Sequence, residues 1–464
     1  MRLTILALVV LSAFPSVFAQ KYNASEVSID NDNEELPSNS IFVGGIQMNE
    51  GDQRHWVNTV KNVGMNTVEV TIYAHQGRWN ENNLWYYEDE PAVVEEIKMA
   101  KAAGLHVVLI LRLQLDHAFS ANHFLWHGSV FPENDYLVQR WFEEYTRFAK
   151  KWAIISEREG VEVFVIGSEL SALFATRPCT ELPDLESYYL SKKKQQDYHK
   201  GMMSFKKVLT EDNLYTPGFI NYTSLEKYLN DEINCKEKWA KVVAFSDSVN
   251  QLDAINLRRS VQNWYWEHLI EGMREVYTGK MTIAANFDNY QEIAFWDKLD
   301  FIGINAYFPL RELSSKRDMA SQIRNSWDSI LDEINAFKEA NKLDEKPVLF
   351  TEIGYGRHSG STLNPWQGFG FSLLDNVKSD SLIIWENQKT DQAERNLALS
   401  LLYECIEKKN FPIAGLLYWK LTSKKEQLKY DPFALHIGTK SDDNLQEILV
   451  NFLELDQTES SQKE

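Results

Sequence analysis

Cysteine is scarce in this sequence, which has three cysteines among its 464 residues. An odd number of thiols cannot pair completely. Cys405 lies in a helical pattern, and we expect it to be a buried thiol. Cys179 and Cys235 both lie in one long loop region. A disulfide between them in an oxidising compartment and two free thiols are equal alternatives at this point.

Positive charge is also in short supply. Lysine and arginine total 48 against 67 aspartates and glutamates, which gives a formal net charge of −19. A surface this acidic argues against nucleic acid or an anionic membrane as a partner, because both repel negative charge. It does not argue against uncharged substrates such as glycans. The composition, 44% hydrophobic and 25% charged, is that of a globular protein with one large domain or two ordinary ones.

Apolar runs long enough to cross a membrane are absent, since no stretch reaches about 18 apolar residues. The longest lies at the N-terminus, where Arg2 precedes the apolar segment Leu3–Phe14 and residues 17–19 form an acceptable cleavage site. We interpret residues 1–19 as a secretory signal peptide cleaved near Ala19. The mature protein is then expected to be secreted, either to the periplasm or outside the cell. Two glycosylation sequons, at Asn23 and Asn221, matter only in a eukaryotic host.

Short apolar runs alternate with amphipathic stretches along most of the chain. Such alternation predicts parallel strands joined by right-handed helical crossovers, and eight units fit an α/β protein with a (β/α)₈ barrel. A doubly wound sheet is the competing fold. It usually has a glycine-rich phosphate turn after its first strand, whereas Gly44-Gly45 lies inside the first strand here. The eight predicted strands are 41–47, 67–73, 106–113, 161–167, 281–287, 301–308, 347–351 and 413–421.

The connection between the fourth strand and the fourth helix is unusually long. It contains a predicted helix at 191–209 and both pairable cysteines, so we interpret it as an elaborated rim of the active site. Seven further helices are predicted at 52–62, 91–103, 134–159, 256–277, 319–341, 391–409 and 444–455. The expected organisation is a signal peptide, a polar lead-in, one catalytic barrel domain and a polar tail, at residues 1–19, 20–37, 38–456 and 457–464.

Two predicted strands, the fourth and the seventh, end on a glutamate after a buried apolar run. These residues are Glu169 and Glu352. Each alone could be a helix cap or a member of a buried ion pair. Two carboxylates on nearly opposite strands of an eight-stranded barrel are instead what glycoside hydrolysis needs, one to protonate the leaving oxygen and one to act at the anomeric carbon. The 14 tryptophans and 20 tyrosines fit a sugar-stacking cleft as well as a large aromatic core.

These strand ends resemble those of glycoside hydrolase family 113, in the large retaining clan A. The resemblance covers about residues 40 to 455 apart from the long insertion, and the segment around Glu352 is its most specific part. The motifs that carry it are Ile166-Gly167-Ser168-Glu169-Leu170, Phe350-Thr351-Glu352-Ile353-Gly354-Tyr355, Leu111-Arg112-Leu113-Gln114-Leu115-Asp116, Trp126-His127-Gly128, Ser359-Gly360, Asn364-Pro365-Trp366, Gln392–Tyr403 and Gly415–Leu421.

The resemblance implies that Glu169 is the acid/base and Glu352 the nucleophile of a retaining mechanism, with carboxyl groups about 5–5.5 Å apart. The charge of Glu352 should then help to keep Glu169 protonated. Tyr307 resembles the tyrosine that hydrogen-bonds the nucleophile, and Trp419 the sugar platform, although a barrel-rim aromatic and a core tryptophan are the ordinary alternatives. The remaining candidates for sugar contacts are Arg112, Gln114, Trp126, Asn286, Asn305 and Trp366, of which Arg112, Asn286 and Asn305 could equally make structural hydrogen bonds.

The chain departs from the family pattern at several positions that are expected to face the sugar. Ser168 stands where clan members usually have asparagine, and His127 stands where arginine is usual. Arg112 and Gln114 replace lysine and histidine in the third-strand motif. These changes should leave the chemistry intact, while they put the identity of the sugar in doubt. The usual activity of the family is endo-β-1,4-mannanase.

No cofactor or metal is expected. His117, His123 and His127 are close in sequence, but their spacing matches no strong zinc pattern and no acidic partner completes one. We expect them to line the cleft. The leading hypothesis is a retaining endo-mannanase-like hydrolase acting on a polysaccharide or oligosaccharide. The alternatives are another clan A β-glycosidase, including an exo-acting one, and a glycan-binding barrel without catalysis.

Overall fold

Eight parallel strands close into a barrel in the computed structural model. Their order is β1 (Phe42–Gln47), β2 (Thr67–Gln76), β4 (His106–Leu115), β5 (Val163–Ser168), β6 (Lys280–Asn286), β7 (Ile302–Asn305), β8 (Val348–Ile353) and β11 (Ile413–Thr422), and β11 pairs again with β1. Each strand was predicted within a few residues, and the predicted (β/α)₈ barrel is confirmed. Two-residue strands β3 (Leu84–Trp85) and β12 (Leu435–His436) pair with β2 and β11.

The structure describes residues 41–48, 50–86, 90–175, 192–204, 220–243, 252–312, 315, 317–366, 371–375, 381–385, 390–439, 441 and 443–457. The predicted signal peptide, the polar lead-in and Cys179 lie outside the described residues. Cys235 and Cys405 both carry free thiols, and Cys405 is buried as expected.

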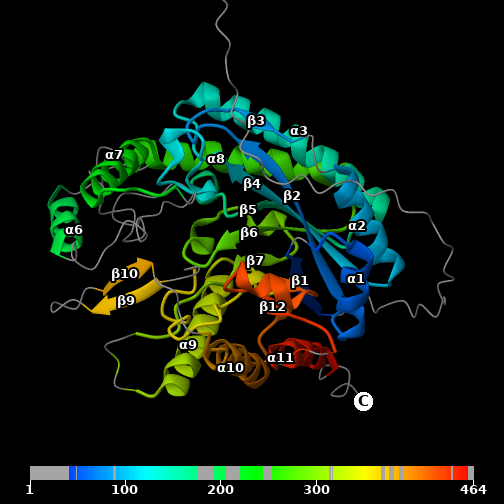
Figure 1. The fold of residues 1–464 in the computed structure, drawn as a ribbon. Coiled ribbons are helices and arrows are strands. Elements are labelled where there is room, and N and C mark those ends of the chain that lie inside the picture. The colour runs from blue at the N-terminus through cyan, green and yellow to red at the C-terminus, as the bar shows by residue number, and fades with distance from the viewer. Residues whose placement is uncertain are drawn as a thin grey trace, which may run out of the picture. The chain divides into compact units, whose positions relative to one another are not determined.

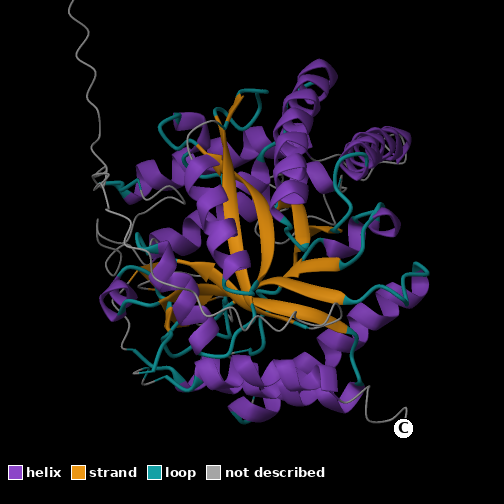
Figure 2. Ribbon diagram, turned by 90° about the vertical axis from the view of Figure 1, so that its right-hand side faces the viewer, coloured by secondary structure: helices purple, strands orange, loops and turns teal. Residues whose placement is uncertain are grey.

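Helices surround the barrel strands on the outside (Figures 1 and 2). They bury their apolar faces against the strands, as α3 does with Trp141, Tyr145 and Trp152. The residues at both ends of α3 are typical helix caps. The side chain of Asn134 accepts a hydrogen bond from the Leu137 amide at the start of the helix, and Gly160 ends the helix with a φ of 71°. The outer helices are α1 (Gln53–Asn62), α2 (Glu90–Ala102), α3 (Asp135–Glu159), α8 (Leu252–Arg274), α9 (Met319–Ala340), α10 (Ala393–Lys409) and α11 (Leu445–Asn451).

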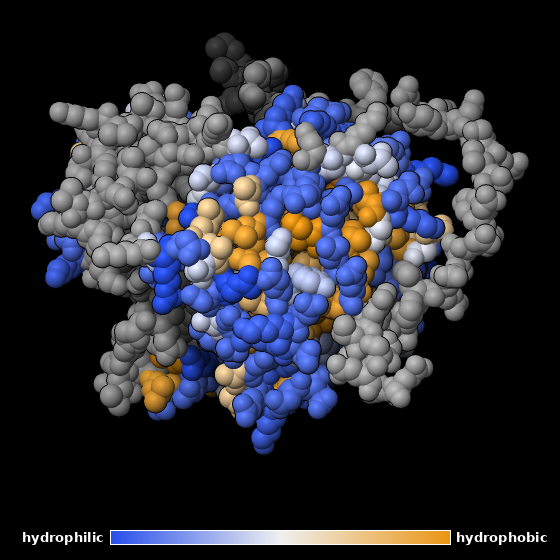
Figure 3. All heavy atoms as spheres, turned by 90° about the horizontal axis from the view of Figure 1, so that it is seen from below, coloured by the Kyte–Doolittle hydropathy of each residue, from blue (hydrophilic) through white to orange (hydrophobic). Residues whose placement is uncertain are grey.

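The connection from β6 to β7 differs from the others in its form. It contains two short 3₁₀ helices, η6 (Tyr290–Glu292) and η7 (Trp296–Lys298), in place of an α-helix. None of the helices that the structure describes has the length and apolar character needed to span a membrane. The face of the molecule seen from below in Figure 3 carries mostly polar residues, with apolar ones between them.

Successive side chains of a barrel strand point alternately outward and inward, and this alternation divides the apolar residues into an outer and an inner core. Val107, Leu109 and Leu111 of β4 pack outward under the helices, while Val108 and Ile110 join a small cluster inside the barrel. The inner cluster also contains Val163, Val165, Ala284, Phe301, Leu349 and Leu417. Two residues further along their strands, the same inward rows reach Arg112, Asn286 and Trp419. The barrel interior is therefore apolar at one end and polar where the strands finish.

The long connection after β5 contains more helix than the sequence predicted. A short helix α4 (Ser171–Phe174) is followed by α6 (Lys192–Ser204), which lies within the predicted helix 191–209, and by α7 (Leu225–Val243), which was not predicted. Met202, Tyr222, Leu225 and Leu229 pack with Phe124 into a separate apolar cluster. Strands β9 (Phe371–Asp375) and β10 (Ser381–Trp385) form an antiparallel hairpin in the connection after β8.

Many of the aromatic side chains belong to the core. Six tryptophans of the described part of the chain are fully buried, and Trp152 and Trp327 are examples that pack under the helices. Trp85, Trp264 and Trp366 are instead among the exposed large apolar residues. Many aromatic rings of the described residues therefore serve the packing of a large barrel, while a few exposed ones could contact a ligand.

Candidate active site

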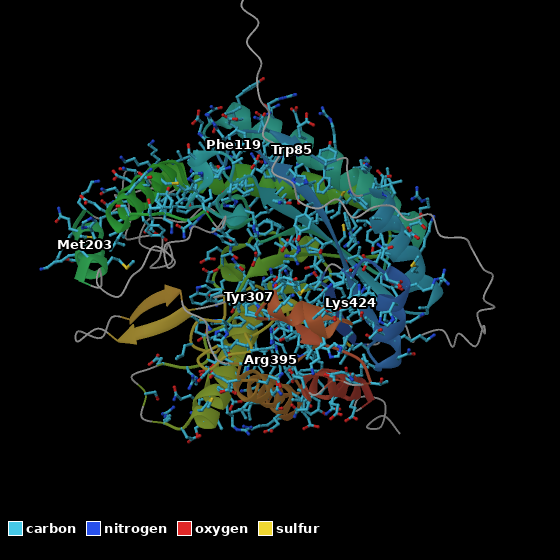
Figure 4. The ribbon with its side chains drawn as sticks, viewed as in Figure 1. Trp85, Phe119, Met203, Tyr307, Arg395 and Lys424 are labelled. Carbon is cyan, nitrogen blue, oxygen red and sulfur yellow. The ribbon has the colours of Figure 1, made fainter. Side chains whose placement is uncertain are left out.

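Glu352 ends β8 inside a set of hydrogen-bond donors at the carboxyl ends of the strands. The amide Nδ2 of Asn305 donates to its Oε1 at 2.9 Å, and the hydroxyl of Tyr307 donates to its Oε2 at 2.6 Å. The guanidinium of Arg112 forms an ion pair with the same carboxylate. Glu352 is only 3% exposed, so these three donors replace the water that a free carboxylate would bind. Figure 4 shows Tyr307 beside the barrel strands.

Arg112 and Asn305 are themselves held in place by buried groups. Arg112 Nη2 donates to Glu69 Oε1 of β2 at 2.9 Å, and its Nη1 lies 3.3 Å from the hydroxyl of Ser168. Asn305 accepts a hydrogen bond from Thr351 at 2.8 Å, which orients its amide so that the NH₂ group faces Glu352. One guanidinium therefore bridges two buried carboxylates, Glu69 and Glu352.

Glu169 follows the last residue of β5 in an unusual backbone conformation. Its φ is 55°, in the left-handed region that side-chain-bearing residues rarely occupy. Its amide donates to the carbonyl of Ala284 on β6 at 2.8 Å, which fixes this turn to the barrel. Its Oε2 lies 2.8 Å from Nε2 of His127. Strained backbone of this kind occurs often at functional sites, where surrounding contacts maintain it.

The loop that carries His127 passes directly against Glu169. A Cβ atom at Gly128 would lie 2.7 Å from the carbonyl oxygen of Glu169 and 2.4 Å from the ring of Trp126. Only glycine therefore fits at this position without displacing the backbone of Glu169. The indole of Trp239, in the long insertion, donates to the carbonyl of Ser129 at 2.7 Å. Helix α7 thus supports the loop that places His127 beside Glu169.

The two carboxylates interact electrostatically and differ in their surroundings. Burial raises the pKa of Glu352, and the nearby charge of Glu169 adds to the rise against the opposing effect of Arg112. Burial also acts on Glu169, but the hydrogen bond and charge of His127 outweigh it and hold the pKa of Glu169 below its usual range. This direction is opposite to the sequence-based expectation of a protonated Glu169, and the cause is His127.

Two further groups contribute to the electrostatics of the site. Burial raises the pKa of Glu69 to about 8 even though Arg112 opposes the change. Burial and the adjacent Glu352 carboxylate raise the pKa of Tyr307 well above its ordinary value, so the phenol stays a hydrogen-bond donor. A protonated Glu69 is neutral, so the positive charge of Arg112 then acts on Glu352.

The candidate sugar-contact residues have different environments. The ring centroid of Trp419 lies 4.8 Å from the Arg112 guanidinium and 4.5 Å from Lys420 Nζ, and the peptide bond after Trp419 is cis. Trp126 is half-buried and packs edge-on against His127 with ring centroids 4.9 Å apart. Trp366 is 39% exposed and stacks on Phe287 at 5.6 Å.

The polar candidates divide into buried and exposed residues. Arg112 and Asn305 are buried and bind Glu352, which agrees with the structural hydrogen bonds that were one of the two alternatives for them. Asn286, also buried, continues the inward row of β6, and Gln114 is exposed near the end of β4. Within the described parts of the chain, no group of three or more histidine, cysteine or acidic side chains could hold a metal ion.

Sequence reasoning missed the roles of Glu69 and the His127 contact. A charged residue within the otherwise apolar strand Thr67–Tyr73 was the available signal for Glu69, since a buried carboxylate needs a partner. His127 was expected to face the sugar with His117 and His123. Of the three, it is His127 that contacts Glu169. His117 Nε2 lies 2.8 Å from the Leu125 carbonyl, and His123 interacts electrostatically with His117 and with Asp231 of the insertion.

Comparison with known families decides the classification. The model of Glycoside Hydrolase Family 113 matches residues 46–177 and 253–385, which is more than half of the chain. The chain belongs to glycoside hydrolase family 113. This assignment confirms the resemblance found in the sequence, and it makes the protein a glycoside hydrolase. The unmatched interval between the two segments coincides with the helical insertion of this family 113 member.

Solved structures share the fold of this family 113 protein. A β-mannanase of the same family from Alicyclobacillus acidocaldarius, in complex with ManMIm, superimposes with a TM-score of 0.54 at 14% identity, covering 90% of this chain and 98% of that one. A family 113 β-1,4-mannanase gives a TM-score of 0.52 at 17% identity, with 89% and 99% covered. At these identities the likeness shows the fold alone. No curated relative matches the sequence significantly.

Proposed function

We propose that this protein is a secreted, retaining β-glycoside hydrolase that cleaves β-1,4-mannan-type polysaccharide within the chain. Glu352 acts as the nucleophile and Glu169 as the acid/base. The observation that carries the proposal is the environment of Glu352, whose carboxylate is held by Asn305, Tyr307 and Arg112 while Glu169 stands close enough to interact with it. Three fixed donors on one oxygen pair orient a nucleophile, and they oppose the rise in its pKa that burial causes.

The proposed reaction proceeds in two displacements. In the first, Glu352 attacks the anomeric carbon, the bond to the leaving oxygen breaks, and Glu169 gives that oxygen a proton. In the second, Glu169 takes a proton from water, and the resulting hydroxide equivalent attacks the anomeric carbon and releases Glu352. Arg112, Asn305 and Tyr307 act on Glu352 in both steps, since they orient the carboxylate before attack and stabilise it when it leaves.

The mannan substrate rests on the family and on its solved members. The two family 113 structures that share the fold are described as a β-mannanase and a β-1,4-mannanase. We assign the sugar platform to Trp419, whose half-buried ring lies beside Arg112, and a second stacking surface to the exposed ring of Trp366. Gln114 and His127 differ from the family pattern, so another β-glycan is the outcome to test against mannan.

A substrate panel tests the proposal. Purified protein is assayed for reducing-end release on β-mannan, glucan, xylan and short β-1,4-oligosaccharides, alongside Glu352→Gln and Glu169→Gln. We expect internal cleavage of mannan by the wild type and loss of nearly all activity in Glu352→Gln. The matched control is Glu95→Gln, since Glu95 is an exposed glutamate on α2. A folded wild type that is inert on every glycan would overturn the proposal, and release of single sugars from chain ends would replace endo action by exo action.

Secretion is tested separately. The gene is expressed in its own host, and the protein recovered outside the cytoplasm is sequenced from its N-terminus. We expect the mature chain to begin at Gln20, after removal of residues 1–19. Recovery of the full-length chain from the cytoplasm alone would contradict this part of the proposal.

A further inference from the structure

His127 is the titratable side chain that hydrogen-bonds the proposed acid/base, and this contact is the basis of the inference. Nε2 of His127 and Oε2 of Glu169 lie 2.8 Å apart, a distance at which a proton can pass between them. The side chain of His127 is 28% exposed and that of Glu169 only 12%. The contact is built into the fold, because Gly128 lets the loop touch the Glu169 backbone and Trp239 ties the same loop to α7.

The donors around the other carboxylate have a different chemical character. Glu352 is bound by a guanidinium, an amide and a phenol, none of which exchanges a proton near neutral pH. An imidazole does so between about pH 5 and 8. Among the described residues, the groups that act electrostatically on Glu169 include His127 from the loop after β4 and Arg112 from β4, with an Asn305 hydrogen bond from β7. Glu352 of β8 faces it across the site.

We propose that His127 and Glu169 share a single catalytic proton, which rests on the imidazole in the free protein and moves to Glu169 when a sugar covers the pair. This inference rests on the proposed function, because it gives the acid/base residue the source of its proton. The low pKa of Glu169 agrees with a carboxylate paired to an imidazolium. Covering the partly exposed ring removes its water, and a neutral acid beside a neutral imidazole is then favoured over a dry ion pair.

The proton balance closes over one turnover. The proton moves from Nε2 to the Glu169 carboxylate, and Glu169 delivers it to the leaving oxygen as Glu352 forms its bond to the anomeric carbon. Water then attacks the anomeric carbon and breaks the ester bond to Glu352, and its proton passes to Glu169. When the product leaves, solvent reaches the pair again and the proton returns to Nε2. His127 is thus a positioning residue that acts on the leaving oxygen through Glu169.

The pair should hold its proton to higher pH than a lone carboxylate does, because the ring and the carboxylate titrate as one system. His127→Gln keeps an amide N–H donor near Glu169 but cannot carry the shared proton. In this variant Glu169 alone holds the proton, and we expect the alkaline limb of the kcat/KM profile to move toward acid. Each pH unit reduces the protonated fraction, and hence the rate on that limb, about tenfold. The control is His55→Gln, an exposed histidine on α1.

Leaving groups separate proton delivery from a general loss of structure. The assay compares dinitrophenyl and phenyl β-glycosides of the sugar that the wild type accepts, at one acidic and one mildly alkaline pH. A dinitrophenolate leaves without protonation, so His127→Gln should lose activity at alkaline pH on the phenyl substrate alone. The ratio of rates within one variant does not depend on how much of the sample is folded. Equal loss on both substrates at every pH, or an unchanged profile, would overturn proton sharing.

A measurement without turnover distinguishes failure of this inference from failure of the proposed function. The ring resonances of His127 are followed through a pH titration by NMR in the wild type and in Glu169→Gln. Proton sharing predicts that the ring titration in Glu169→Gln differs from that in the wild type, because the carboxylate takes part in it. An unchanged midpoint would refute the shared proton even in a protein that hydrolyses mannan. A shifted midpoint in a protein inert on every glycan would uphold the pair and refute the function.

Discussion

Glu69→Gln is expected to stabilise this protein, although it removes one partner of a buried ion pair. Glu69 is 1% exposed, and burial raises its pKa to about 8 from an ordinary 4.5. A carboxyl group whose pKa is raised in the folded state binds its proton more tightly there than in the unfolded chain. Its contribution to folding is therefore most favourable at a pH where it is protonated in both states. That contribution is present below about pH 4.5 and is lost as the pH rises toward 8. Glutamine has no such loss, because it is neutral throughout.

The magnitude follows from the pKa difference. At pH 7 the Glu69 carboxyl group is ionised in the unfolded chain but still protonated in the folded protein. Over the interval of about 2.5 pH units from pH 4.5 to pH 7, this difference lowers the stability by roughly 3 kcal/mol, at 1.36 kcal/mol per unit. Arg112 keeps its ion pair with Glu352 in the variant, so its charge is not left unpaired. Burial also raises the pKa of Glu96 to about 7, so Glu96 lowers the stability of both proteins in the same pH window. Because this effect is equal in both, it cancels from the difference between them.

Urea unfolding at several pH values measures this effect. The stability difference between Glu69→Gln and the wild type should grow by about 3 kcal/mol between pH 5 and pH 7.5. Glu95→Gln is the matched control, because Glu95 is an exposed glutamate on α2, and the two variants are compared at each pH. Parallel stability curves for Glu69→Gln and the wild type would refute the assignment of a buried, proton-holding Glu69.

Three further substitutions test contacts around the two catalytic candidates. Tyr307→Phe removes the 2.6 Å hydrogen bond to Glu352. Because loss of a hydrogen bond to a charged group is costly, kcat/KM should fall about 10- to 100-fold. The control is Tyr430→Phe at an exposed position, which should leave kcat/KM unchanged. Gly128→Ala should lower both kcat and Tm, because its Cβ would displace the Glu169 backbone, and Gly272→Ala, where nothing lies within 4 Å, is the control. Wild-type turnover in Gly128→Ala would show that this contact is unimportant. Trp239→Phe loses the 2.7 Å bond to Ser129 and should weaken activity more than Trp264→Phe, a change at an exposed site; equal effects would mean that the insertion does not support the His127 loop.

The barrel could be predicted from the sequence because its signals are local. Apolar runs such as His106–Leu113 and the alternation with amphipathic helices give the order of strands, and a parallel order with right-handed crossovers then leaves few folds. The carboxyl ends of β5 and β8 follow directly, so Glu169 and Glu352 could be identified as a pair. Tyr307 was also predicted correctly as a donor to Glu352.

The contacts between different strands could not be predicted in the same way. Glu69 and Arg112 are 43 residues apart, and their pairing depends on the register of β2 against β4 and on the inward direction of both side chains. The proximity of His127 to Glu169 depends on a loop held by Gly128 and by an indole from α7, a helix that the sequence pattern did not reveal. Because the contact between His127 and Glu169 was not predicted, the downward shift in the pKa of Glu169 was not predicted either.

Trapping of the covalent intermediate tests the central claim most directly. A 2-deoxy-2-fluoro-β-mannoside with a dinitrophenyl leaving group slows both displacements, and its good leaving group lets the glycosyl-enzyme form faster than it is hydrolysed. We expect intact-protein mass spectrometry to show one added sugar, and peptide mapping to place it on Glu352. No such adduct should form in Glu352→Gln. An adduct on another residue, or wild-type hydrolysis that releases products of inverted anomeric configuration, would contradict the account.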